Sequence, residues 1–133
     1  MNNEEVKNII KWINEGFNEN YTVKNLPNNI NKIYWDFISQ YQELSENFII
    51  KYKDYVNWNY ISIFQNLSES FIIKYKNEVN WSNISINQKL SRSFMIKFKD
   101  YLVWKKIKEK YNITYFDICK YINFDNNKIN LNI

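Results

Sequence analysis

The sequence predicts an all-α fold, a solenoid of stacked helical hairpins with an N-terminal helical cap and a degenerate C-terminal cap. All five tryptophans are separated by a constant 23 residues; they are Trp12, Trp35, Trp58, Trp81 and Trp104. A fixed period of this length is typical of tandem-repeat proteins. Within each repeat, apolar residues recur four apart, as in Phe48, Tyr52 and Val56, without the alternation of a strand. Hairpins of this kind complete their core only by stacking on neighbouring repeats.

Each of the three central repeats, 35–57, 58–80 and 81–103, is expected to form two helices. They share the pattern W-x-x-I-S-x-x-Q-x-L-S-x-x-F-[IM]-I-K-[YF]-K. Asn57 and Asn80 directly precede a tryptophan and are favourable N-caps for a short first helix that ends near the glutamine. Serine or threonine then stands before a second, longer helix. These second caps are Ser45, Ser68, Ser91 and Thr114.

The predicted organisation is a single domain over 1–133, in which caps flank the repeats at 35–103. Residues 1–34 form the N-terminal cap, and 104–124 form a degenerate C-terminal repeat that has lost the shared serine and glutamine. Residues 125–133 form an asparagine-rich tail. The N-terminal cap is expected to contain an amphipathic helix with an apolar stripe of Val6, Ile9, Ile10 and Ile13.

The positions shared by all repeats fall on one side of the first helix, which we expect to be the core side with the tryptophans as anchors. In the second repeat they are Trp58, Ile61, Ser62 and Gln65. A buried serine or glutamine without a hydrogen-bond partner would cost about 1–3 kcal/mol. We therefore predict that the serines and glutamines form a polar ladder, with hydrogen bonds across successive repeats.

The composition argues against catalysis. The chain has no histidine, one glycine and one cysteine, so it lacks the usual base for a nucleophile and any glycine-rich phosphate loop. We expect an enzymatically inactive protein with no catalytic residue, no metal site and no cofactor. Cys119, in the degenerate repeat, is expected to be a packing residue.

The variable, outward side of the first helices is the preferred binding site. In the first two full repeats it is apolar and aromatic, and its residues are Phe37, Tyr41, Tyr60, Ile63 and Phe64. Exposed aromatic side chains on a rigid scaffold are frequent anchors of protein interfaces, so another protein is the expected partner. The alternative is that the N-terminal helix or the segment 18–31 covers these residues. The same aromatics would also support a self-associating structural protein.

Lysines suggest a second class of partner, nucleic acid or another polyanion. Lys51, Lys74 and Lys97 recur at one repeat position, and Lys105, Lys106 and Lys110 follow in the degenerate repeat. Residues 81–133 hold 10 basic and 4 acidic residues, whereas 1–80 hold 8 and 10. Lysines at a regular rise are suited to phosphates. Against this interpretation, every full repeat carries acidic residues and the net charge is only +4.

No apolar run approaches the roughly 20 residues of a membrane span, and the N-terminus is polar. The single cysteine excludes a disulfide within one chain and fits a reducing compartment. We therefore expect a soluble, cytoplasmic protein that does not contact membranes.

The 23-residue pattern resembles a short tandem repeat of uncharacterised proteins from phages, large DNA viruses and low-GC bacteria. The match covers 35–103, and it brings no catalytic or ligand-binding residue with it. The resemblance implies a viral or phage origin, with a place in the host-cell cytoplasm. Asn, Ile and Lys, which A- and T-rich codons encode, supply 62 of the 133 residues and fit such genomes. A small binding protein of this origin is expected to block a host defence protein, such as a nucleic-acid-guided nuclease.

Overall fold

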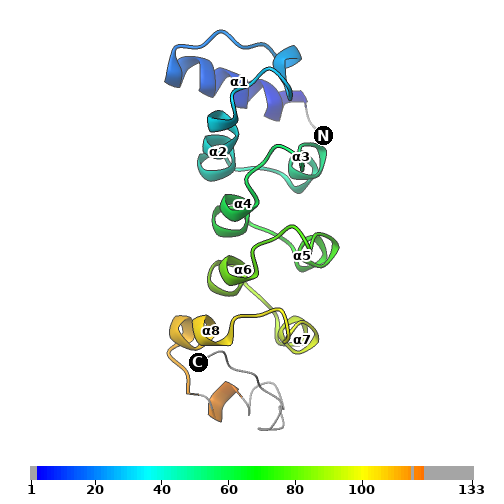
Figure 1. The fold of residues 1–133 in the computed structure, drawn as a ribbon, viewed down its shortest axis with the longest axis vertical. Coiled ribbons are helices and arrows are strands. Elements are labelled where there is room, and N and C mark those ends of the chain that lie inside the picture. Colours follow the sequence, from blue (N-terminus) through cyan, green and yellow to red (C-terminus); the bar gives the residue numbers. More distant parts are fainter. Residues whose placement is uncertain (1–2, 115, 119–133) are drawn as a thin grey trace. The chain divides into compact units, whose positions relative to one another are not determined.

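In the computed structural model, residues 3–114 and 116–118 are described, and every regular element within them is a helix (Figure 1). This confirms the predicted all-α class. The chain divides into two compact units, Met1–Gln65 and Asn66–Ile133. The organisation of 1–133 as one repeat domain stays a prediction.

The N-terminal unit combines the long first helix with the first helical hairpins. Its elements are α1 (Asn3–Phe17), η1 (Val23–Asn25), α2 (Lys32–Tyr41), α3 (Glu46–Lys51) and α4 (Trp58–Phe64). The apolar stripe predicted for α1 is at most 6% exposed at all four positions, so this helix packs as an amphipathic helix should. Helices α2 and α4, which start consecutive repeats, pack against each other.

The C-terminal unit repeats the arrangement. Its elements are α5 (Glu69–Lys74), α6 (Trp81–Asn87), α7 (Arg92–Lys97) and α8 (Trp104–Tyr111), followed by a helical turn at 116–118. Here α6 packs against α8. One buried cluster of this unit consists of Met95, Leu102, Trp104, Ile107 and Ile118. Cys119, the rest of the predicted degenerate repeat and the tail 125–133 lie outside the described residues.

The predicted N-caps are confirmed. The side chains of Asn57 and Asn80 accept hydrogen bonds from the first turns of α4 and α6. Ser45, Ser68 and Ser91 do the same for α3, α5 and α7. These bonds satisfy N–H groups that a helix cannot pair internally.

Two helix boundaries differ from the prediction. The first helix of repeat 35–57 begins at Lys32 rather than at its tryptophan, because Asn31 provides an N-cap by accepting from the Ile33 N–H. The second helices are shorter than expected, since α3, α5 and α7 each have six residues. After α3, Tyr55 N and Val56 N donate to Tyr52 O, and this turn lets the chain reach the next asparagine cap within the 23-residue period.

The predicted polar ladder is confirmed for Gln65 and Gln88. Gln65 follows α4 directly and is 4% exposed. Its Oε1 accepts from Leu44 N at 2.9 Å, and its Nε2 donates to Ser39 O at 2.9 Å and to Gln42 O at 2.7 Å. In the C-terminal unit, Gln88 Oε1 accepts from Leu67 N at 3.1 Å. Each glutamine thus ties its repeat to the preceding one.

The serines bond differently from the prediction, within their own repeat. Ser39 Oγ donates to Trp35 O at 2.7 Å and accepts from Asn57 N at 2.9 Å. Ser85 repeats both contacts, with Trp81 O at 2.7 Å and Val103 N at 2.9 Å. A hydroxyl has one donor and two acceptor lone pairs, and this pair of bonds joins the start of a repeat to its end.

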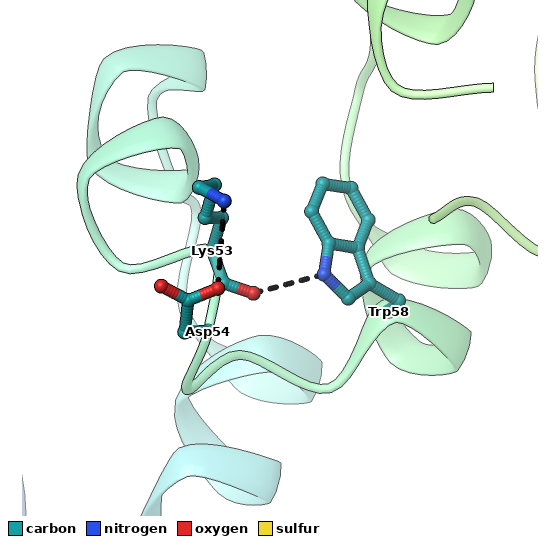
Figure 2. Close-up of polar contacts among 3 residues, drawn as sticks. All are labelled: Lys53, Asp54 and Trp58. Atoms are coloured by element: carbon teal, nitrogen blue, oxygen red, sulfur yellow. Dashed lines mark hydrogen bonds and ion pairs between the residues drawn. The ribbon is translucent and has the colours of Figure 1, made fainter. Parts of the chain in front are cut away.

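The repeat tryptophans are less uniformly buried than expected. Trp35 and Trp104 are 2% and 7% exposed, whereas Trp58 and Trp81 are only half-buried. Figure 2 shows that the Trp58 indole lies beside the turn that follows α3 and donates from Nε1 to Lys53 O at 3.0 Å, and the buried Trp104 makes the equivalent bond to Lys99 O at 2.9 Å. The neighbouring Lys53–Asp54 ion pair, at 3.5 Å, is highly exposed and contributes little to stability.

Candidate functional site

The predicted aromatic residues lie on the outer face of α2 and α4 in the N-terminal unit. On α2, the rings of Phe37 and Tyr41 are 6.1 Å apart, and on α4 the rings of Tyr60 and Phe64 are also 6.1 Å apart. Each pair is separated by four residues, which places both rings on one helix face. The repeat period makes Tyr60 the counterpart of Phe37 and Phe64 the counterpart of Tyr41. The two helices therefore carry matching pairs of rings.

Buried contacts fix these two helices in register. The bonds from Gln65 to Ser39 O and Gln42 O join the carboxyl end of α4 to that of α2. Tyr41 and Phe64 directly precede the two glutamines, so the same contacts bring their backbones together. The rings consequently stand on a scaffold with little freedom to separate.

The outer end of this array is exposed. Tyr41 is 62% exposed and Phe64 is 50% exposed, while Phe37, Tyr60 and Ile63 are half-buried. Neighbouring large apolar side chains with this much exposure indicate a binding surface, whereas single exposed apolar residues are common on any protein. The first two full repeats thus each present exposed apolar side chains, on two helices that pack against each other.

The predicted covering of these residues by the N-terminal segment is found at one edge. Phe17, the last residue of α1, stacks on Phe37 with ring centroids 5.3 Å apart and planes 5° apart. The ring of Phe17 also lies 5.1 Å from that of Tyr34. Phe17 itself stays 39% exposed, so the end of α1 extends the apolar face. We define the aromatic surface as Phe17, Phe37, Tyr41, Tyr60, Ile63 and Phe64.

Sequence reasoning missed Phe17 and also Ile33, which is 50% exposed. Ile33, Phe37 and Tyr41 stand four residues apart on α2, so helical periodicity alone would have found Ile33. Phe17 gave no such signal. Its contact with Phe37 depends on how the chain returns through 18–31, which has no periodic pattern.

The segment 18–31 is anchored beside this surface. Tyr34 Oη donates to Glu19 Oε1 at 2.6 Å, and the ring of Tyr21 lies 5.9 Å from that of Tyr34. This hydrogen bond, together with burial and the nearby carboxylate charge, raises the pKa of Tyr34 to about 12. The carboxylate favours the protonated phenol because only that form can donate.

The predicted anionic-partner lysines have local roles. Lys51, Lys74 and Lys97 are the exposed last residues of α3, α5 and α7, where a cation complements the helix dipole. Their ammonium groups lie 5.2, 5.5 and 5.7 Å from the centroid of the aromatic ring that follows each in sequence. Lys51 belongs to the N-terminal unit and the other two to the C-terminal unit. A continuous lysine row stays a prediction.

The remaining three lysines lie on α8. Lys105 and Lys110 are exposed and Lys106 is half-buried. Lys110 Nζ donates to Gln88 O at 3.1 Å and lies 4.9 Å from the centroid of the Tyr111 ring. Tyr111 occupies the position where a full repeat has its glutamine. Lys110 therefore supplies a donor to the preceding repeat that the missing glutamine would otherwise provide.

Within the residues that the structure describes, no three His, Cys, Asp or Glu side chains form a group able to hold a metal ion. Over the same residues, no helix has both the length and the apolar character that crossing a membrane requires. Comparison with known proteins finds no matching family model, no matching curated protein and no matching solved structure.

Proposed function

We propose that the chain is a non-enzymatic protein-binding module whose partner docks on the aromatic surface of the N-terminal unit. The observation that carries this proposal is two matching ring pairs on packed helices, Phe37 with Tyr41 on α2 and Tyr60 with Phe64 on α4, of which Tyr41 and Phe64 are strongly exposed. Buried phenylalanine and tyrosine side chains remove about 150–250 Å² each from water. A few such residues supply most of the energy of a typical protein interface.

The rigidity of the scaffold supports the same proposal. Binding costs less when the contacting side chains are already held in place, and the Gln65 bonds hold α2 and α4 together before a partner arrives. Tyr41 and Tyr60 also carry hydroxyl groups that can donate to a polar rim. In the C-terminal unit, the equivalent outer positions are Asn83 and Asn87, which confines the aromatic character to the first two full repeats.

The proposal includes a solenoid built from all the repeats. Its support is that Gln65 and Gln88 make the same type of contact to the preceding repeat, each within its own unit. The 23-residue spacing continues without a break from 35 to 103. The further step, that the partner is a host defence protein encountered by a phage or virus, is supported by the resemblance of the repeat, by the small size of the chain and by its abundance of Asn, Ile and Lys.

The aromatic surface can be tested with a matched pair of double variants. Tyr41→Ser with Phe64→Ser removes the two most exposed rings of the array. Ile73→Ser with Ile96→Ser removes apolar side chains that are 37% and 40% exposed elsewhere in the chain. The unaltered chain and the two variants are immobilised and exposed to nuclease-treated lysate of cells in which the chain is expressed naturally. Each protein that they retain is then purified, and its affinity for the unaltered chain and for each variant is measured.

We expect a retained protein whose affinity falls at least about a thousandfold in the aromatic variant, since losing two anchors costs roughly 2 kcal/mol or more each, and stays unchanged in the isoleucine variant. Equal affinity in both variants would contradict the proposal. Retention from untreated lysate that is absent from the nuclease-treated lysate would instead support the lysine-based nucleic-acid function. Concentration-dependent light scattering that the aromatic variant abolishes would identify the partner as a second copy of the chain.

A further inference from the structure

A groove of about 450 Å³ lies between α1 and η1 in the N-terminal unit, outside the aromatic surface. Its floor includes two aliphatic side chains, of which Ile10 is buried and Val23 is 40% exposed. The rest of its described lining is polar or charged and consists of Lys7, Lys11, Asn14, Glu15 and Thr22. Five of the seven described lining residues are exposed, so the groove is open to solvent.

Local hydrogen bonds hold the two walls of the groove in place. Asn14 Nδ2 donates to Tyr21 O and Asn14 Oδ1 accepts from Tyr21 N, both at 2.8 Å, which ties the returning chain to α1. At the start of η1, Thr22 donates its N–H at 2.6 Å and its hydroxyl at 3.0 Å to Asn25 Oδ1. Helix α1 also packs against η1. A groove that is formed before its occupant arrives costs less to fill.

Lys7 and Lys11 form a cationic edge of the groove on α1. They are four residues apart, so their side chains lie on the same side of the helix, where like charges repel. Lys11 pairs with Glu15 at 3.9 Å, but these side chains are 72% and 69% exposed and such a pair contributes little. Within residues 3–114 and 116–118, Lys7 has no carboxylate within ion-pair distance. An anion bound at this edge would therefore relieve a repulsion without breaking a strong contact.

The lining of the groove defines the chemistry of an occupant. The side-chain amide of Asn14 and the hydroxyl hydrogen of Thr22 are already bonded, so the groove offers mainly aliphatic contact and cations. None of its described lining residues is aromatic, whereas single-stranded nucleic acids are held by bases that stack on aromatic rings. Small-molecule sites enclose most of their ligand, and this groove is too open to do so. An acidic peptide with an aliphatic side chain satisfies both features.

We propose that the groove binds an acidic peptide segment of another protein. An aliphatic side chain of the segment contacts Ile10 and Val23, while its carboxylates accept hydrogen bonds from Lys7 and Lys11. Hydrogen bonds between two charged groups are stronger than neutral ones, and the aliphatic floor adds apolar contact. No residue of the aromatic surface lines the groove, so this proposal does not rest on the function proposed above.

A pair of synthetic peptides provides the assay. The full chain is titrated with an acetylated peptide in which pairs of glutamates flank a leucine, and with a control peptide in which glutamine replaces every glutamate. Labelling of the valine methyl groups with ¹³C locates the binding, because Val23 lines the groove and the buried Val79 belongs to the C-terminal unit. We expect the glutamate peptide to cause a saturable shift of the Val23 signals alone, with an affinity that falls as salt is raised. The control peptide should bind at least about fivefold more weakly.

Two lysine variants with the same change in charge test the cationic edge. Lys7→Ser with Lys11→Ser should weaken binding of the glutamate peptide at least about fivefold. Lys32→Ser with Lys89→Ser alters exposed lysines outside the groove and should leave the affinity nearly unchanged, because distant surface charges are screened. Circular dichroism verifies that both variants fold.

Further variants test the floor of the groove and its independence from the aromatic surface. Val23→Glu places a carboxylate on the aliphatic floor and should abolish binding of the glutamate peptide. Glu15→Gln removes an anion from the rim, so this variant should bind the peptide at least as tightly as the unaltered chain. Tyr41→Ser with Phe64→Ser should not affect peptide binding, which separates a failure of this proposal from a failure of the aromatic surface.

Several results would overturn the proposal. They are the absence of a saturable Val23 shift in the unaltered chain, equal peptide affinities in the two lysine variants, and weaker binding in Glu15→Gln. Polyuridine RNA or phosphatidylserine vesicles that shift the Val23 signals at lower concentrations than the glutamate peptide would also overturn it, since the occupant would then be a nucleic acid or a membrane.

Discussion

Replacing Gln65 by methionine tests whether the polar ladder stabilises the hairpins. Methionine preserves most of the volume of glutamine but none of its hydrogen bonds, so packing is disturbed little. The bonds to Leu44 N and Ser39 O are buried, and the substitution leaves both backbone groups without a partner. At about 1–3 kcal/mol for each unsatisfied buried group, the expected loss is about 2–6 kcal/mol. The Gln42 carbonyl is only partly buried and can bond to water instead.

Urea denaturation followed by circular dichroism measures this loss, with Ser45→Ala as the reference variant. Removal of that N-cap should cost about 1 kcal/mol, which is clearly less than the ladder. Hydrogen exchange gives a local readout, because the Leu44 amide should lose its protection in the methionine variant. A loss smaller than that of Ser45→Ala, with the Leu44 amide still protected, would refute the reasoning.

A companion variant, Gln65→Glu, is expected to have a stability that depends on pH. The introduced carboxyl can accept from Leu44 N, but once ionised it faces the Ser39 and Gln42 carbonyls without a proton to donate. Burial and these carbonyls raise its pKa in the folded chain above the unfolded value of about 4.3. Its favourable contribution is therefore complete below that pH and is lost as the pH rises through the folded pKa. The free energy of unfolding of the variant should therefore lie further below that of the wild type at pH 7 than at pH 4.

Three further predictions address other contacts. Tyr34 should titrate at about pH 12 in an absorbance titration at 295 nm, and Tyr34→Phe should remove this late component of the titration. The stabilising contact of Tyr34 with Glu19 should be lost between about pH 10 and pH 12. Glu69→Gln should lower stability by less than about 1 kcal/mol, because its contact with the serine cap of α7 is exposed; a larger loss in urea denaturation would contradict this. Trp104→Phe should destabilise the chain by about 1–3 kcal/mol more than Trp35→Phe, because the Trp104 indole N–H has a partner and the buried Trp35 N–H has none.

How well the sequence predicted a contact depended on how far apart in the chain its two residues lie. The N-caps and helix faces were predicted correctly, because capping and helical periodicity act within four residues. The Gln65 bonds were anticipated because a buried amide at a fixed repeat position needs partners. The aromatic residues and the exposure of Tyr41 followed from the same projection, whereas the stacking of Phe17 on Phe37 did not. That stacking joins α1 to α2 across the aperiodic segment 18–31, and no local pattern specifies it.

The N-cap of the second helix in a repeat donates its N–H and its hydroxyl to a carboxylate, and different residues supply this carboxylate at the two ends of the repeat series. In α7, the N-cap Ser91 donates from its backbone N–H and its hydroxyl to the carboxylate of Glu69, which belongs to the preceding repeat. The first full repeat has no such predecessor. Its cap, Ser45, donates the same two groups to Glu5 of α1, at 2.8 and 2.7 Å. The N-terminal helix thus reproduces the contact from a different backbone position, at a separation that the 23-residue period does not predict.

At the C-terminal end, the carboxylate for the last cap comes from within the same turn. The preceding repeat carries Arg92 at the position of Glu69, and a guanidinium cannot accept a hydrogen bond. Thr114 donates its N–H and hydroxyl to Asp117 instead. Asp117 holds the position at which the other repeats bury a phenylalanine. The residue that makes the last cap self-sufficient is therefore a polar side chain at a position that the full repeats fill with a buried aromatic ring.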